Sequence, residues 1–190
     1  MRYGLRWVVI ALAMMGWLST AGWTQTDRSD PRRLAKAVEA IENLDALRSG
    51  LAGTFKGKDA PADKSTFKEV CKPVGMQAKQ IAQDNGWKVI QMADKYRNPK
   101  HQLDPEGRQA YNQLEANASL MGLWMRTTFD GAPGARYFRR ITVKSACLAC
   151  HGAKARRPAF VQQGYPDDRA YDFQAGDLRG IYSVFIPEGQ

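Results

Sequence analysis

Cysteine and histidine are scarce in this chain, which has three cysteines and two histidines among 190 residues. A protein zinc site usually takes four such ligands from two separated pairs, and the second pair is missing. The single C-x-x-C lies outside any βαβ pattern, which argues against a thioredoxin-like enzyme. The chain has no internal repeat, and only its N-terminus carries a long apolar run. A repeat architecture and a multi-span membrane protein are therefore excluded.

The scarce residues meet in one segment, Cys147-Leu148-Ala149-Cys150-His151. C-x-x-C-H is the attachment signature of a c-type haem. The two thiols form thioethers with the porphyrin vinyl groups, and the adjacent imidazole becomes the proximal iron ligand. The sequence therefore predicts one covalent haem c per chain, attached at Cys147 and Cys150 and ligated by His151.

The N-terminus predicts export. Arg2 and Arg6 precede an apolar run over residues 7–18, and Ser19-Thr20-Ala21 supplies small residues for cleavage. The run is shorter than the roughly twenty residues of a spanning helix. We therefore expect residues 1–21 to be a signal peptide, with a retained anchor as the alternative. The mature protein is expected in the periplasm with no integral membrane span, where the haem is attached.

The formal net charge of +9 bears on partners. A basic excess can indicate nucleic-acid binding, but here the lysines and arginines are scattered, and an exported protein rarely meets nucleic acid. We expect no nucleic-acid partner. A redox or signalling protein with an acidic surface, or an anionic membrane, is the expected contact.

Hydrophobic periodicity predicts helices first and strands later. The first expected helix runs from residue 34 to Gly50 or Gly53. The second begins at Thr66, which has capping-box spacing to Glu69, and has a kink or late start at Pro73. The third runs from Asp104-Pro105 to about residue 118. Strands are expected at 87–92, 122–129, 136–143 and 181–186, with a hairpin loop at 130–134. This order predicts an α+β domain over residues 34–190, after a flexible lead-in at 22–33. The haem motif falls in a late loop, and residues 152–180 form a long irregular insertion.

Several segments carry a resemblance to a known family. In order they are Glu69-Val70-Cys71, Gly86-Trp87-Lys88-Val89, Tyr96-Arg97-Asn98-Pro99, Tyr137-Phe138-Arg139-Arg140, Cys147 to Gly152, Tyr165-Pro166-Asp167-Asp168 and Gly176-Asp177-Leu178-Arg179-Gly180. Over roughly residues 35–187 the chain resembles the DUF3365 or Tll0287-like family of haem-binding domains. The resemblance implies a PAS-like antiparallel sheet with N-terminal helices and a covalent c-type haem. The chain departs from the family at Lys100-His101-Gln102-Leu103 and at Tyr171-Asp172-Phe173.

The resemblance also implies that the thiolate of Cys71 is the distal iron ligand. From the residues alone, Cys71 is the odd cysteine of an exported protein, and a buried thiol on an apolar helical face is usually an inert small hydrophobe. Competing distal ligands are Met76, Met92, Met121, Met125 and His101.

The distal ligand decides the expected function. A thiolate stabilises ferric iron, whereas a methionine raises the potential. A thiolate that protonates and leaves on reduction would open a coordination position, which suits a redox or gas sensor with His/Cys-ligated iron. We expect such a sensor rather than an enzyme. The alternative is an electron-transfer cytochrome c with a Met or His distal ligand, and a small peroxidase using His101 and Arg97 is the third hypothesis.

The haem propionates are expected to contact basic side chains near the motif. Candidates by position are Arg136, Arg139, Arg140, Lys144, Arg156 and Arg179. Of these, Arg139 or Arg140 is the preferred contact, and the sequence does not choose between them.

Overall fold

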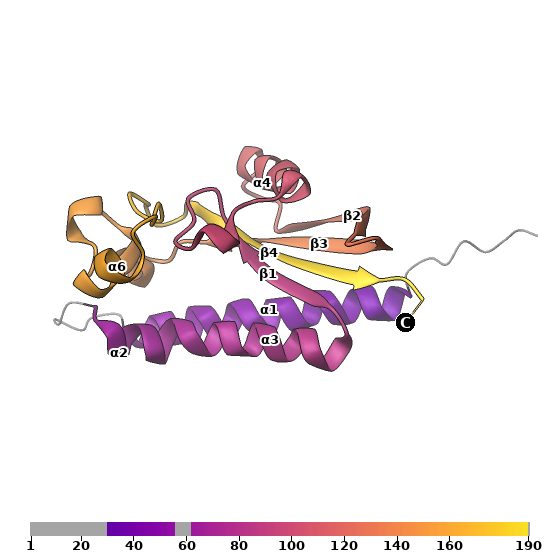
Figure 1. Ribbon diagram of the computed structural model, residues 1–190, viewed down its shortest axis with the longest axis horizontal. Helices are drawn as coiled ribbons and strands as arrows, with labels where there is room; N and C mark the ends of the chain where they lie inside the picture. Colours follow the sequence, from indigo (N-terminus) through magenta and orange to yellow (C-terminus); the bar gives the residue numbers. More distant parts are fainter. Residues whose placement is uncertain (1–29, 56–61, 190) are drawn as a thin grey trace, which may run out of the picture.

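A four-stranded antiparallel sheet lies at the centre of the fold (Figure 1). The computed structural model describes residues 30–55 and 62–189. The strands lie in the order β1-β4-β3-β2, with bounds β1 (Lys88–Met92), β2 (Gly122–Phe129), β3 (Ala132–Thr142) and β4 (Leu178–Pro187). This α+β architecture confirms the predicted fold class, and β2 has the predicted bounds. The signal peptide expected at residues 1–21 lies outside the described residues.

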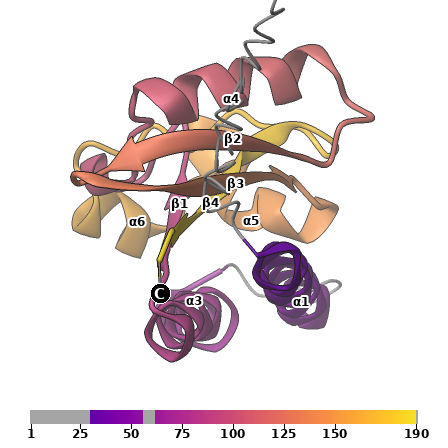
Figure 2. The same ribbon diagram turned by 90° about the vertical axis from the view of Figure 1, so that its right-hand side faces the viewer.

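Helices cover both faces of the sheet (Figure 2). Helices α1 (Pro31–Thr54) and α3 (Lys72–Asn85) pack on one face, in a core that includes Leu44 and Val184. Helix α4 (Pro105–Ala116) packs on the other, where Leu114 contacts the second core. Because both faces are covered, β3 and β4 are buried along nearly their whole length. Among the described helices, none is both long and apolar enough to cross a bilayer.

Helix α1 begins three residues earlier than the sequence predicted. The side chain of Asp30 accepts a hydrogen bond from the backbone N–H of Arg32 at 2.9 Å, and Pro31 occupies the first turn. A capping carboxylate followed by proline is a strong helix start. Residues 31–33, expected in the flexible lead-in, are therefore helical.

The second helical segment starts at Asp63 rather than Thr66. Asp63 accepts from the backbone of Thr66, and the Thr66 hydroxyl accepts in return from the Asp63 N–H, so the capping box closes one turn before the predicted one. After α2 (Lys64–Thr66) the chain makes a π-helical turn over Phe67–Cys71 before α3 begins. Pro73, which has no N–H to donate, lies just beyond this turn. The predicted irregularity near Pro73 is thus a widened turn, and it contains Cys71.

The hairpin between β2 and β3 is tighter than the predicted five-residue loop. Asp130 and Gly131 both have positive φ, at 48° and 79°, and Ala132 already pairs with Phe129. Two central residues with positive φ form the turn that suits the twist of an antiparallel pair. Strand β3 therefore begins within the expected loop.

The C-x-x-C-H segment follows β3 on short helical turns. Ser145–Cys147 form a 3₁₀ turn, and α5 covers Leu148–His151. Leu148 packs against a small core formed by Val143, Ala170 and Phe173. The motif thus lies on a helical turn rather than an open loop. The insertion that follows it contains α6 (Ala159–Gly164).

Candidate haem-binding site

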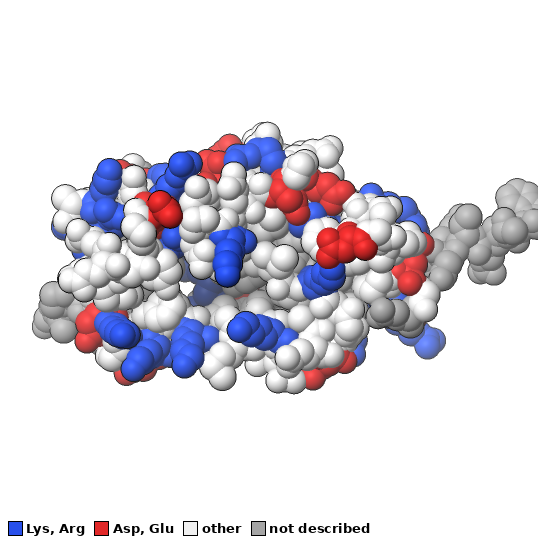
Figure 3. Space-filling model, viewed as in Figure 1, with Lys and Arg blue, Asp and Glu red and all other residues white. Residues whose placement is uncertain are grey.

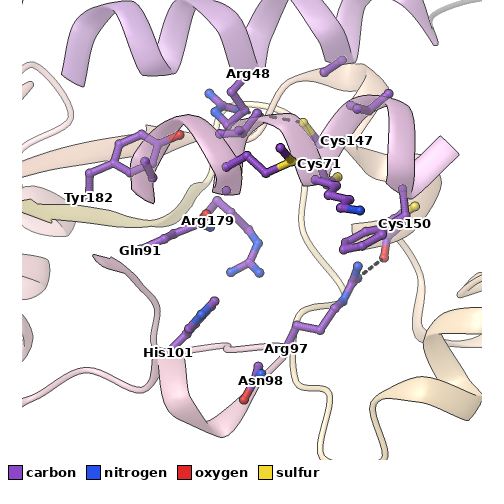
Figure 4. Close-up of a pocket in the computed structure, with 18 of the residues that line it drawn as sticks. Arg48, Cys71, Gln91, Arg97, Asn98, His101, Cys147, Cys150, Arg179 and Tyr182 are labelled. Carbon is purple, nitrogen blue, oxygen red and sulfur yellow. Dashed lines mark hydrogen bonds between the residues drawn. The ribbon is translucent and has the colours of Figure 1, made fainter. Parts of the chain in front are cut away.

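A cavity of about 720 Å³ brings the three cysteines together. Cys71 reaches it from the π-helical turn, and Cys147 and Cys150 reach it from the motif (Figure 4). The remaining walls come from the C-terminal part of α1, from α3, β1 and β4, and from the segment that contains Arg97 and His101. The fold therefore joins the C-x-x-C pair to the third cysteine across a single chamber.

The imidazole of His151 lies next to Cys150 and outside the cavity lining. Its Nδ1 is 2.8 Å from the carbonyl oxygen of Ala170, and its ring packs edge-on against Phe173. The Arg97 Nη2 also lies 3.3 Å from this nitrogen, but the Ala170 carbonyl is closer and can only accept, which favours the tautomer with the proton on Nδ1 and a lone pair on Nε2. Burial, together with the charges of Arg179 and Arg97, lowers the pKa of His151 well below its usual value. This neutral tautomer is the one that binds iron through Nε2.

Burial also holds two of the thiols in their neutral form. It raises the pKa of Cys150 to about 11, partly offset by the charge of Arg97. The pKa of Cys71 is raised for the same reason, although its side chain stays accessible from the cavity. The thiolate form of Cys71 thus needs a further positive charge beside it, such as a metal ion.

Three arginines approach the cavity. Arg48 pairs with Asp45 at 2.7 Å and lies 3.9 Å from the Cys147 sulfur. Arg97 pairs with Asp168, and its Nη2 donates to the Cys150 carbonyl at 2.9 Å. These contacts fix both guanidinium groups beside the motif.

Arg179 is the least compensated of the three. Its only recorded hydrogen bond runs to the Lys95 carbonyl at 2.9 Å, and no carboxylate pairs with it among the described residues. Burial and the charge of Arg97 lower its pKa to about 10. A half-buried cation that no described carboxylate pairs with, pointing into a cavity (Figure 4), favours an anionic ligand.

The cavity wall also holds an unsatisfied hydroxyl. Tyr182 is 1% exposed and lines the cavity, yet its hydroxyl makes no well-aligned hydrogen bond with any described residue, although Arg48 lies close enough to oppose the rise of its pKa. No set of three His, Cys, Asp or Glu side chains is placed to hold a bare metal ion within residues 30–55 and 62–189. A porphyrin brings four nitrogen ligands and two carboxylates of its own. The thiol pair, the free imidazole nitrogen, the uncompensated Arg179 and the Tyr182 hydroxyl fit that group.

Two of the competing distal ligands line this cavity, namely Met76 and His101. The side chain of His101 is exposed and lies on the 3₁₀ turn Pro99–His101. The Ala93 N–H donates to the His101 carbonyl at 2.9 Å and so folds this segment over the cavity. Met92 is instead buried against Arg136, and Met121 and Met125 lie outside the lining. Cys71, Met76 and His101 are therefore the distal candidates that remain.

The structure does not bring Arg139 and Arg140, the preferred propionate contacts, to the cavity. Arg139 is paired with Glu42 and Asp45, each at 2.8 Å. Arg140 donates to the carbonyl oxygens of Leu114 and Leu120 on the other side of the sheet. Of the six candidates only Arg179 lines the cavity. The sequence reasoning missed Arg48, because no local spacing signals that α1 faces the motif.

The fold and site define a class of small α+β domains with a thiol- and arginine-lined cavity between helices and sheet. No curated protein matches this chain significantly. The chain belongs to the Tll0287-like family, whose profile matches residues 27–187. A solved structure, the crystal structure of the cyanobacterial heme-protein Tll0287, is 52% identical in sequence with a TM-score of 0.76. That match covers 85% of this chain and 99% of that chain.

Proposed function

We propose that this chain is a periplasmic c-type haem protein that acts as a redox or gas sensor rather than an enzyme. Cys147 and Cys150 would hold the haem covalently, and His151 and Cys71 would bind its iron. The observation that carries the proposal is the single cavity containing all three cysteines and the uncompensated Arg179. The family and its solved heme-protein member support the choice of cofactor.

Each residue group has a defined task at this site. When bound, the haem supplies an iron whose oxidation state and axial ligands respond to electrons or small gases. His151 presents Nε2 because Ala170 holds its Nδ1 proton. Arg48, Arg97 and Arg179 place positive charge where the two propionates can be neutralised.

Cys71 connects the site to the helices. It ends the π-helical turn and immediately precedes α3, whose Val74 and Ile81 pack in the main core. A change at the Cys71 sulfur therefore acts on a helix already anchored to the sheet. Such a coupling of a local bond to a packed element is what a sensor requires.

The first experiment is expression in a host competent for cytochrome c maturation, followed by the mass and absorption spectrum of the denatured protein. We expect the haem to stay covalently attached to the denatured wild-type protein, and the double variant Cys147→Ser/Cys150→Ser to lose this attachment. A bare polypeptide mass without a Soret band would overturn the proposal.

The second experiment identifies the distal ligand. Cys71→Ala is expected to change the ferric spectrum, whereas His101→Ala, at the opposite side of the cavity, leaves it unchanged. An unchanged Cys71→Ala spectrum with a changed His101→Ala or Met76→Ala spectrum would favour the alternative, an electron-transfer cytochrome c. The position of His101 in the cavity wall is the observation in favour of that alternative.

A further inference from the structure

The cavity mouth has an unusual charge balance. Among the described residues that line the cavity, six side chains are basic and none is acidic; the basic ones are Arg48, Lys72, Lys79, Arg97, Lys100 and Arg179. Figure 3 shows the mouth as a hollow, with basic groups along the α2–α3 edge below it and further basic groups above and inside it. This local excess is larger than a random scatter of the chain's net charge of +9 would give.

The six basic groups divide into an inner and an outer set. The three arginines lie inside, where two are paired with carboxylates and the third, Arg179, is half-buried. Lys72, Lys79 and Lys100 are exposed, and no ion pair is recorded for them in the part of the chain that the structure describes. Their charges are therefore directed at solvent and available to a partner.

An apolar side chain lies between two of these lysines. Lys72, Met76 and Lys79 occupy positions i, i+4 and i+7 of α3, so they share one helical face. Met76 is 60% exposed, the highest value among the exposed large hydrophobic residues. A flexible thioether flanked by cations suits a surface that binds a partner reversibly, because the methionine adapts its shape and the charges steer the encounter.

We propose that Lys72, Met76, Lys79 and Lys100, termed the lysine rim, dock an acidic protein over the cavity mouth. This inference rests on the proposed function, since it places the partner against the edge of the bound haem. An anionic membrane fits less well, because interfacial helices insert several large apolar side chains and this face offers one methionine. Lysines on both sides of a hollow instead match a convex acidic surface entering between them.

Binding to a defined acidic probe tests the lysine rim. Oxidised plant-type ferredoxin, a small acidic iron–sulfur protein, is titrated in a calorimeter against wild type, Lys72→Glu/Lys79→Glu and the control Arg32→Glu/Lys36→Glu. The control makes the same charge change on exposed residues of α1 that do not line the cavity. We expect the rim variant to weaken binding roughly tenfold at low salt and the control less than about twofold. High salt should erase the difference.

Zero-length carbodiimide crosslinking, which joins lysines to carboxylates, gives a second readout. Crosslinks to ferredoxin are expected at Lys72, Lys79 or Lys100, and crosslinks at Lys36 in equal yield would overturn the proposal. Equal loss of binding in rim and control variants would overturn it too. So would tighter, lysine-dependent binding to phosphatidylglycerol vesicles, since the partner would then be a membrane.

The two proposals fail separately. Normal haem content in every variant, with no difference between rim and control, would remove the docking surface alone. A wild-type protein without haem that still binds ferredoxin through the rim would remove the proposed function alone.

Discussion

The carboxylate of Asp168 determines where the ring of His151 sits. Its Oδ1 accepts from the backbone N–H of Ala170 at 3.0 Å, and the Ala170 carbonyl in turn holds the His151 Nδ1. The same carboxylate pairs with Arg97 and Arg157 at 3.3 and 3.1 Å, with its side chain fully buried. One carboxylate thus fixes both the partner of the imidazole and the arginine beside it.

Asp168→Asn should therefore destabilise the protein and disturb the haem site together. Removing the charge leaves Arg97 and Arg157 without their buried counter-ion, at a cost of about 3 kcal/mol. Urea unfolding measures the loss, and the visible spectrum reports on His151. Asp94→Asn, which breaks an exposed pair with Arg108, is the control and should cost less than about 1 kcal/mol. Equal losses would show that Asp168 has no special role.

Tyr182→Phe should leave stability unchanged or raise it slightly. The hydroxyl is buried without a well-aligned hydrogen bond to any described residue, and an unmatched buried polar group costs about 1–3 kcal/mol. If this hydroxyl serves the bound group, the variant should also hold haem less well. Thermal unfolding and haem content measure the two effects. A loss of several kcal/mol of stability would instead reveal a hydrogen bond to Tyr182 in the folded protein.

Stability should fall steeply at alkaline pH. Burial raises the pKa of both Tyr182 and Tyr111 from 10.0 to about 12, and nearby carboxylates add to the effect. The raised pKa means that the folded state favours the neutral phenol. The stability that this preference contributes is complete below the unfolded-state pKa, at pH ~10, and is lost as the pH approaches the folded-state pKa, at ~12. For Tyr182 this amounts to about 2–3 kcal/mol. Urea midpoints between these pH values should decline, and less so in Tyr182→Phe. A flat profile would contradict the shifts.

Replacing glycine by alanine should have opposite effects on stability at Gly180 and at Gly50. A Cβ on Gly180 would overlap the Met92 carbonyl oxygen and lie 3.1 Å from the Ala93 Cβ, so Gly180→Ala should cost about 1–3 kcal/mol. Gly50 lies within α1 with open space around it, so Gly50→Ala should stabilise by about 0.5–1 kcal/mol. Chemical denaturation of both variants checks the signs. A tolerated Gly180→Ala would mean that β1 and β4 separate easily.

Local patterns predicted the parts of the fold that depend on neighbours in sequence. The bounds of β2 and the Asp104–Pro105 helix start are both found where they were expected. The position of Arg139 away from the cavity could not be predicted, because its partners Glu42 and Asp45 lie almost a hundred residues earlier in the chain. The fold of the His101 segment over the cavity has a different origin: it depends on an isolated bridge between Ala93 and Gln102, which leaves no periodic pattern in the sequence.

The π-helical turn at Phe67–Cys71 carries one more residue than a regular α-helical turn would hold. The wider turn absorbs this surplus residue, so the helical segments before and after it keep nearly the relative phase of an uninterrupted α-helix. Deleting a single residue such as Lys68 would therefore let the helix close into uniform α geometry, with Phe67 still beside Phe160 and α3 still packed on the sheet. What the deletion would remove is the local widening of the backbone that ends at Cys71. The surplus residue thus changes the course of the chain at this cysteine without changing the face that either flanking segment presents.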